Sequence, residues 1–298
     1  MSKRRCGSVA LVGRPNAGKS TLANQLIGQK IAIVSDKPQT TRNRPVGIRT
    51  RGESQFIFVD TPGIHKPGYR LNERMMQLVL EALKDVDVVV HLVDLAQNYG
   101  KGESYAVDLV RRFKKRAILA LNKVDLVNKG RILPVLEFYD QFSVYEEMVP
   151  VSALRGENLE ALLDCIEKRL PEGEFRYPSE EITDQNERFI VAEIIREKVL
   201  LHTRRELPYA TAVKVDLFDE SRRKAGFVRI AASIVVDKGG QKKIVIGRGG
   251  RMIKVIGMEA RKEIEEFLQV AKIYLDLNVR VVSEWRNAAH LLDELGVR

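Results

Sequence analysis

The chain has 298 residues, of which 44% are hydrophobic and 30% are charged, and this balance is typical of a soluble globular protein long enough for two domains. Its formal net charge of +10 favours an anionic partner, either nucleic acid or an acidic membrane surface. The two cysteines, Cys6 and Cys165, are too few and too far apart for a disulfide scaffold or a zinc site, so we expect a reducing cytosol. The longest apolar run, residues 86–95, contains charged residues and cannot span a bilayer, and the apolar stretch after the basic N-terminus is too short for a signal peptide.

A strand–loop–helix pattern comes first along the chain. Residues 9–12 are apolar and predict a strand, and the apolar positions of residues 22–27 suit a helix. Between them, residues 13–20 match G-x-x-x-x-G-K-[ST], a loop whose backbone N–H groups point at phosphate oxygens. Lys19 is then placed to contact β- and γ-phosphates, and the hydroxyl of Ser20 to ligate Mg²⁺. The predicted phosphate-binding residues of this stretch are Gly13, Asn16, Ala17, Gly18, Lys19, Ser20 and Thr21.

A polar stretch and a hairpin follow. Residues 35–43 lack periodicity and predict an exposed loop, while residues 46–50 and 55–59 predict two paired strands. The second strand ends in the motif Asp-Thr-Pro-Gly at residues 60–63. On its own this motif would predict a tight turn. Downstream of a phosphate loop, it predicts that Asp60 holds Mg²⁺ through water and that the N–H of Gly63 approaches the γ-phosphate.

The rest of the first half alternates between helices and buried strands. Helices are expected at residues 71–83, 104–115 and 158–169, and strands at 86–93, 117–121 and 148–151. The near-continuous apolar runs of the strands are typical of parallel sheets covered on both faces. We therefore predict an α/β fold of the P-loop NTPase type, with a mostly parallel sheet flanked by helices.

Two short motifs at strand ends predict guanine recognition. Asn122-Lys123-Val124-Asp125 follows the strand at 117–121, and the carboxylate of Asp125 can accept both the N1–H and the 2-amino group of guanine, a pair that adenine does not present. The aliphatic stem of Lys123 can cover the base. A backbone N–H of the later Ser152-Ala153-Leu154 stretch, at Ala153, can meet guanine O6. The predicted base-binding residues are Asn122, Lys123, Asp125, Ser152, Ala153 and Leu154.

These four motifs, in this order, resemble the G1, G3, G4 and G5 elements of translation-factor-type GTPases. The resemblance implies that GTP, GDP and Mg²⁺ are the ligands. It also implies that a threonine of the first switch lies within Gln39, Thr40, Thr41 and Arg42, with Thr41 favoured over Thr40 as the Mg²⁺ ligand. The metal set is then Ser20, Thr41 and, through water, Asp60. The stretch after Gly63 would form the second switch.

One position departs from the Ras-like pattern. Ile64 stands where those enzymes have the glutamine that orients the attacking water, so we expect slow intrinsic hydrolysis. His65 is adjacent and could be a base, although a surface loop histidine is the preferred interpretation. Asn16 resembles the asparagine of potassium-stimulated GTPases, whose amide oxygen helps to hold K⁺, and a simple turn-forming role is equally open.

A linker and a second domain follow. Residues 171–178 begin and end with proline and have little periodicity. Beyond them, helical spacing at residues 187–201 is followed by strand patterns at 212–218 and 228–236, and then by an apolar run at 244–246 that ends in a glycine loop. A helix after that loop, a strand at 272–282 and a terminal helix at 285–295 complete the chain. Trp285 is expected in the core.

The order of these elements resembles an α+β type II KH domain, in which a GxxG loop and its adjoining helix clamp about four nucleotides of single-stranded nucleic acid. Here GxxG is residues 247–250. The predicted RNA-binding residues are Lys242, Lys243, Gly247, Arg248, Gly249, Gly250, Arg251 and Lys254, and Val245, Ile246 and Ile253 are predicted to form an apolar floor for bases. The alternative is a glycine-rich loop beside a solvated basic face.

A GTPase domain joined to such a KH domain resembles the Era GTPases, with residues 1–170 as the GTPase domain, 171–185 as the linker and 186–298 as the KH domain. The resemblance implies a cytoplasmic protein that binds the 3′ end of small-subunit ribosomal RNA and assists maturation of the 30S-type subunit, with peripheral association at the inner membrane. A monomer is expected. One alternative is a regulatory GTPase whose second domain docks on a protein or membrane surface. A tRNA-modifying GTPase is disfavoured, because neither cysteine has a catalytic motif around it.

Overall fold

The computed structural model describes residues 4–35, 37, 40–64, 69–97, 101–203 and 207–295. Its internal contacts divide the chain into two compact units. The first comprises Met1–Ala32, Thr41–Pro67 and Met75–Asp184, and the second comprises Ile33–Thr40, Gly68–Arg74 and Gln185–Arg298. Two short segments from the first half of the chain thus belong to the second unit, which no pattern in the sequence indicated.

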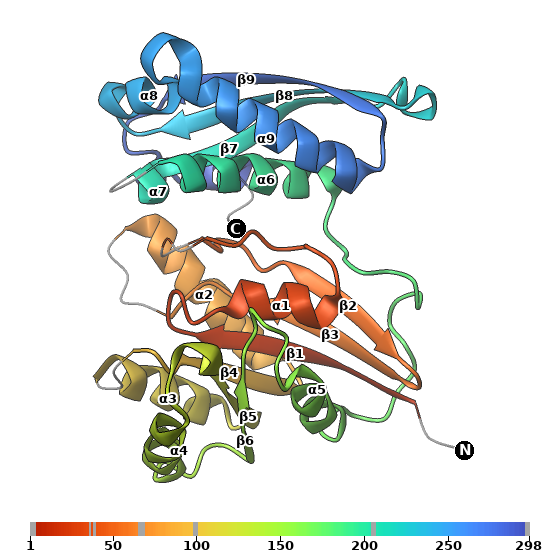
Figure 1. The fold of residues 1–298 in the computed structure, drawn as a ribbon, viewed down its shortest axis with the longest axis vertical. Helices are drawn as coiled ribbons and strands as arrows, with labels where there is room; N and C mark the ends of the chain where they lie inside the picture. The colour runs from red at the N-terminus through yellow and green to blue at the C-terminus, as the bar shows by residue number, and fades with distance from the viewer. Residues whose placement is uncertain are drawn as a thin grey trace. The chain divides into compact units, whose positions relative to one another are not determined.

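The first unit contains a six-stranded sheet in the order β2-β3-β1-β4-β5-β6 (Figure 1). Every neighbouring pair is parallel except the β2–β3 hairpin. The mostly parallel α/β sheet expected from the apolar runs is therefore confirmed. Its strands are β1 (Arg5–Gly13), β2 (Val46–Arg51), β3 (Ser54–Asp60), β4 (Val88–Asp94), β5 (Arg116–Asn122) and β6 (Glu147–Val151).

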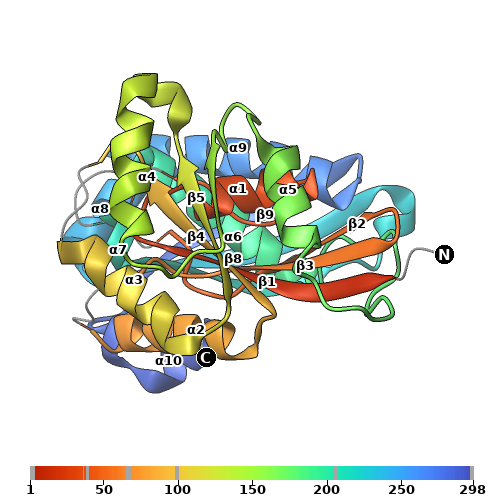
Figure 2. The same cartoon turned by 90° about the horizontal axis from the view of Figure 1, so that it is seen from below.

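Helices cover both faces of this sheet (Figure 2). Alternate side chains of the central strands belong to different apolar clusters, because successive residues of a strand point to opposite faces. α1 and α5 pack with Val9 and Leu11 on one face, and α2 and α3 with Ala10 and Val12 on the other. The helices are α1 (Lys19–Ile27), α2 (Arg70–Asp85), α3 (Lys101–Phe113), α4 (Ile132–Asp140) and α5 (Leu159–Glu167).

The carboxyl ends of the parallel strands meet at one edge of the sheet. The register pairs Leu11 with Asp60, and Asp94 with Asn122. Gly13, at the end of β1, is paired with Leu92 of β4. This edge therefore brings together the ends of the strands that carry the predicted motifs, as expected for an open α/β sheet.

The second unit is built on a three-stranded sheet in the order β7-β8-β9. β7 and β8 are antiparallel, whereas β8 and β9 are parallel, so the chain between them crosses over the sheet. That crossover carries α8, the glycine loop and α9. The elements are α6 (Glu187–His202), α7 (Leu207–Ala210), β7 (Thr211–Asp219), β8 (Phe227–Val236), α8 (Gly239–Ile246), α9 (Arg251–Leu268), β9 (Lys272–Val281) and α10 (Ala289–Glu294).

Two expectations for the second half were wrong in detail. The apolar run at 244–246 is the last turn of α8, a helix that the sequence analysis missed. The terminal helix expected at 285–295 is broken at Ala288, whose ψ of 106° is not helical, into a 3₁₀ turn at Trp285–Asn287 and the short α10. Trp285 lies in the core as expected, and its Nε1–H donates to the carbonyl of Ala210 at 2.9 Å.

Three consecutive charged residues of α6 are buried: Arg196, Glu197 and Lys198. Arg196 donates to the backbone carbonyl of Thr40, and Glu197 accepts the backbone N–H of Val34 at 3.0 Å. Lys198 pairs with Glu197 at 3.1 Å and with a carboxylate of α9. The two charged residues that precede Lys198 therefore bind the backbone at Val34 and at Thr40.

Tyr69 and Arg74 are held by residues that follow β9. The guanidinium of Arg286 lies 4.3 Å from the centre of the Tyr69 ring and is fixed by buried Asp237 at 2.7 Å. Arg74 forms an ion pair with Asp293 at 2.7 Å. Among the helices that the structure describes, none is both long enough and apolar enough to cross a membrane.

Candidate nucleotide and RNA sites

The loop between β1 and α1 depends on its glycines. Gly13 has a φ of 151°, and a Cβ atom there would lie 2.3 Å from the carbonyl oxygen of Leu92. Gly18 has a φ of 97°, and a Cβ atom there would lie 2.2 Å from Nδ2 of Asn122. Asn16 also adopts a positive φ, of 62°. Glycine at positions 13 and 18 therefore lets the backbone curl as the phosphate loop requires.

Lys19 is buried against the loop that precedes it. Its Nζ donates to the carbonyl of Gly13 at 3.2 Å and to that of Arg14 at 3.0 Å. Burial lowers the pKa of Lys19 to about 8, although nearby Asp60 acts in the opposite direction. The ammonium group therefore lies inside the curl of the loop, where a phosphate would supply the missing negative charge.

Three oxygen-bearing side chains meet at the end of β3. The hydroxyl of Ser20 donates to Oδ2 of Asp60 at 2.7 Å and lies 2.8 Å from the hydroxyl of Thr41, which itself lies 3.3 Å from the same Oδ2. Asp60 is fully buried, and burial raises its pKa to about 6 against the opposing charge of Lys19. Within the described part of the chain, its second oxygen, Oδ1, is buried without a hydrogen-bond partner. Oxygen ligands and an orphaned carboxylate oxygen fit Mg²⁺, which prefers such donors.

The structure distinguishes between the two candidate threonines. Thr41 joins Ser20 and Asp60, whereas the hydroxyl of Thr40 donates to the carbonyl of Lys37 at 2.6 Å. Gln39 lies outside the described residues. Arg42 is buried and Thr21 is half-buried in the first turn of α1. The geometry thus agrees with the preference for Thr41, whose role as a metal ligand stays a prediction.

The residues after Asp60 pack tightly on the phosphate loop. A Cβ atom on Gly63 would lie 2.8 Å from the backbone nitrogen of Pro15. The backbone N–H of Ile64 donates to the carbonyl of Gly13 at 3.0 Å. Ile64 is only 4% exposed, and its side chain lies in the apolar cluster between the sheet and the helices α2 and α3. A side chain at this position therefore points into the core rather than toward solvent. His65, the other candidate here, lies outside the described residues.

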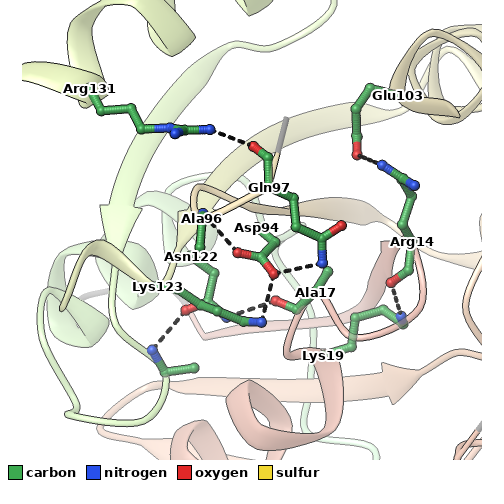
Figure 3. Close-up of polar contacts among 11 residues, drawn as sticks. Arg14, Ala17, Lys19, Asp94, Ala96, Gln97, Glu103, Asn122, Lys123 and Arg131 are labelled. Atoms are coloured by element: carbon green, nitrogen blue, oxygen red, sulfur yellow. Dashed lines mark hydrogen bonds and ion pairs between the residues drawn. The ribbon is translucent and has the colours of Figure 1, made fainter. Parts of the chain in front are cut away.

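Asn122 connects the phosphate loop to the loop after β6. Its Nδ2 donates to the carbonyl of Ala17 at 2.8 Å (Figure 3). Its Oδ1 accepts the backbone N–H of Ala153 at 2.9 Å. The N–H that we expected to meet guanine O6 is thus donated to Asn122 in this structure. Asp125 accepts the hydroxyl of Ser152 at 2.6 Å, which orients its carboxylate. Leu154 is 68% exposed beside it.

Asp94, at the end of β4, is a site residue that the sequence analysis missed. Its Oδ2 accepts Nζ of Lys123 at 2.7 Å and Nε2 of Gln97 at 3.0 Å, and its Oδ1 accepts the backbone N–H of Ala96 at 2.9 Å (Figure 3). Lys123 itself has a φ of 68°. Asp94 thereby fixes the side chain predicted to cover the base. The end of an apolar strand next to the Asn-Lys-x-Asp strand was the only signal that could have identified it.

The glycine loop of the second unit begins at a position where any side chain would be strained. Gly247 has a φ of 75°, and a Cβ atom there would lie 2.6 Å from Cβ of Met252. Gly249 and Gly250 also have positive φ values, of 60° and 75°, but added Cβ atoms would meet nothing within 4 Å. The loop is therefore open toward solvent at its last two glycines. Most of the predicted basic residues around it are exposed, namely Lys243, Arg248, Arg251 and Lys254, whereas Lys242 is half-buried.

The apolar floor expected beside this loop needs a correction. Val245 is fully buried in the core of the second unit and cannot contact a base. The exposed apolar side chain of this turn is instead Ile244, with 53% of its surface accessible, because the run is helical and Val245 points inward. Ile246 and Ile253 are partly buried.

Comparisons with known proteins agree with both halves. A family model described as a 50S ribosome-binding GTPase matches residues 8–123, and a KH domain model matches residues 206–286. The fold and its two sites therefore define a GTPase that carries a C-terminal KH domain.

Two solved structures match along almost the whole chain. Era from Aquifex aeolicus, solved as a variant bound to GDP and AlF₄⁻, is 37% identical, with a TM-score of 0.94 over 98% of this chain and 99% of that chain. A structure of Era in complex with MgGDPNP and nucleotides 1506–1542 of 16S ribosomal RNA is also 37% identical, with a TM-score of 0.94 over 99% of each chain. This chain belongs to the Era family of GTPases.

Proposed function

We propose that this chain is a Mg²⁺-dependent, GTP-hydrolysing switch that binds single-stranded RNA near the 3′ end of small-subunit ribosomal RNA and assists maturation of that subunit. The observation that carries the proposal is the 37% identical Era structure, matched over 99% of both chains, which was solved with MgGDPNP and a 16S ribosomal RNA fragment. The exposed basic residues around the open glycine loop support the RNA half of the proposal.

On the phosphate side, the chain contributes positive charge and ordered donors. Lys19 exchanges the loop carbonyls of Gly13 and Arg14 for phosphate oxygens, and the N–H groups of the loop bind the rest. Ser20, Thr41 and Asp60 would hold Mg²⁺, the last through water. Mg²⁺, when bound, neutralises charge that develops on the phosphates.

On the base side, Asp125 accepts the two guanine donors and Ser152 keeps its carboxylate oriented. Asn122 positions the site without contacting the base, because its amide nitrogen and its amide oxygen already bind backbone groups of the two surrounding loops. A base that lacked the two donors would leave the carboxylate unsatisfied, which accounts for selectivity against adenine.

Hydrolysis is slow in this proposal, because the buried side chain of Ile64 cannot orient water. A role for potassium would rest on Asn16, whose amide oxygen would help to hold the cation at the phosphate loop, and a simple turn-forming role for Asn16 is the alternative. Turnover in KCl and in NaCl at equal ionic strength tests this role. Faster hydrolysis in KCl supports it, and equal rates remove it.

The switch acts through the first switch segment. Thr40 is held by Arg196 in the second unit, and the next residue, Thr41, lies with Ser20 and Asp60 in the first. A ligand that draws Thr41 toward Mg²⁺ therefore acts on the segment that α6 binds. We propose that nucleotide state changes RNA binding by this route.

The wider assignments are part of the same proposal. The partner is the 30S-type subunit, the protein is a cytoplasmic monomer, and the net charge of +10 supports peripheral association with an anionic inner-membrane surface. The alternative is a GTPase whose second unit docks on a protein or membrane surface instead of RNA.

The test is binding of a short RNA that matches the 3′ end of the small-subunit RNA, by protein loaded with GDP or with GDPNP, at low salt. The matched variants are Gly249→Asp and Gly52→Asp, because both glycines have φ values near 60° and open space around an added Cβ. The proposal expects tighter binding with GDPNP, lost in Gly249→Asp and retained in Gly52→Asp. Equal, weak binding in both nucleotide states would favour the docking alternative.

A further inference from the structure

Arg14, the second residue of the phosphate loop, connects the loop to a helix. Its backbone carbonyl is one of the two that accept Nζ of Lys19. Its side chain extends the other way, and Nη1 donates to Oε1 of Glu103 at 3.0 Å (Figure 3). Glu103 lies in the first turn of α3, far from the loop in sequence. One residue thus joins the lysine that faces phosphate to a neighbouring helix.

The carboxylate of Glu103 is held from two sides. Only 5% of Glu103 is exposed, and its second oxygen, Oε2, accepts the hydroxyl of Tyr139 at 3.1 Å. Tyr139 is fully buried on α4. Burial and the adjacent Glu103 raise the pKa of Tyr139 above its usual range, so its hydroxyl stays protonated and donates.

An ion pair between a buried carboxylate and a partly exposed guanidinium is weak support for a stability role. Removing a carboxylate from water costs several kcal/mol, and apolar side chains of similar volume are often as stabilising. What the pair constrains is geometry, because Glu103 is itself held from two sides and so limits where the Arg14 guanidinium can lie. Phosphate loops act through such preorganisation, since donors already in place need not be ordered when the ligand arrives.

We infer that Glu103 and Tyr139 are positioning residues of the phosphate loop, which act through Arg14 to lengthen the residence of nucleoside diphosphates and triphosphates. The inference rests on the nucleotide site proposed above. The interaction operates on the phosphate side, because Arg14 is itself part of the phosphate loop and its side chain is held by α3 rather than by the base-binding loops. Ligands that engage the loop through β- and γ-phosphates depend on it, and a guanosine monophosphate does not.

Two variants and a control separate this role from general stability. Arg14→Met keeps the aliphatic stem but removes the guanidinium, and Glu103→Gln keeps an acceptor but removes the charge. Asp108→Asn on the same helix removes the carboxylate of an exposed pair with Arg111 and is the matched control. Dissociation of fluorescent GDP and GDPNP, and the affinity for GMP, are measured for each protein and for the Arg14→Met/Glu103→Gln double variant.

We expect GDP and GDPNP to dissociate about tenfold faster from Arg14→Met, as fits the loss of a charge-assisted hydrogen bond. GMP affinity should stay within twofold, Glu103→Gln should show a smaller effect, and the double variant should match Arg14→Met, because coupled residues are not additive. Unchanged GDP dissociation in Arg14→Met, or equal weakening of GMP and GDP, would overturn the inference. Failure of the wild-type protein to bind any guanine nucleotide would instead refute the proposed function.

Discussion

Asn122 offers a direct test of how the nucleotide site is assembled. Its side chain is 2% exposed and is bonded only to backbone groups, the carbonyl of Ala17 and the N–H of Ala153. Replacement by alanine would leave both groups buried without a partner. Each unsatisfied group costs about 1–3 kcal/mol, so we expect a loss of about 2–6 kcal/mol in the free energy of unfolding of the first unit. This is a large part of the stability of an ordinary domain.

Urea unfolding followed by far-UV circular dichroism measures the loss, and binding of fluorescent GDP reports the site. Asn128→Ala is the matched control, because Asn128 is exposed and its side chain only caps a short 3₁₀ turn by accepting the N–H of Gly130 at 3.2 Å. Asn122→Ala should unfold at markedly lower urea and bind GDP poorly, while Asn128→Ala stays close to the wild type. If the two variants lost the same stability, to within about 0.5 kcal/mol, the bridging role given to Asn122 would be wrong.

Three further changes have definite outcomes. Ile64→Gln should not speed GTP hydrolysis and should cost about 2–4 kcal/mol in unfolding free energy, because the amide would enter the apolar cluster; a higher kcat at saturating GTP would contradict this. Trp285→Phe should cost about 1–3 kcal/mol, since the buried carbonyl of Ala210 loses its donor, and an unchanged urea midpoint would show that the bond contributes little. Burial lowers the pKa of His91 to about 3, so the unfolded chain, with a histidine pKa near 6.5, binds the extra proton as the pH falls. The wild type should therefore lose about 2 kcal/mol more than His91→Gln between pH 6.5 and pH 5, and parallel stability curves would refute this.

The strands of the first unit could be predicted because their apolar runs are long and end in recognisable motifs. The helix at Gly239–Ile246 was missed because only three apolar residues mark it, and its first turn contains two glycines. The break at Ala288 was missed for a different reason. Alanine is a good helix former, so the residue type at this position does not predict its non-helical ψ of 106°. Local composition predicts long helices and strands well. It predicts them poorly when tertiary contacts determine the residues at which a helix or strand begins and ends.

The same division holds at the site. The nucleotide-binding roles of Lys19, Asp60 and Asp125 could be predicted because they lie in short motifs with characteristic spacing. Asp94 and Glu103 lie far from those patterns in the sequence, and only the alignment of neighbouring strand ends and helices brings them near. Partners of this kind are set by the fold, so a single sequence does not reveal them.

The parallel pairing of β8 with β9 also sets an order of events during synthesis. The glycine loop lies in the crossover between these strands, so the two helices beside it are anchored on a sheet whose third strand ends only at Val281. Trp285, which donates a hydrogen bond to Ala210 at the end of α7, emerges later still. A nascent chain therefore cannot complete the sheet that supports the glycine loop until β9 has been synthesised, because the parallel pairing needs both strands and forms slowly. The first unit precedes it in the chain and can begin to fold earlier. On a translating ribosome, the protein would gain its nucleotide site well before its RNA site.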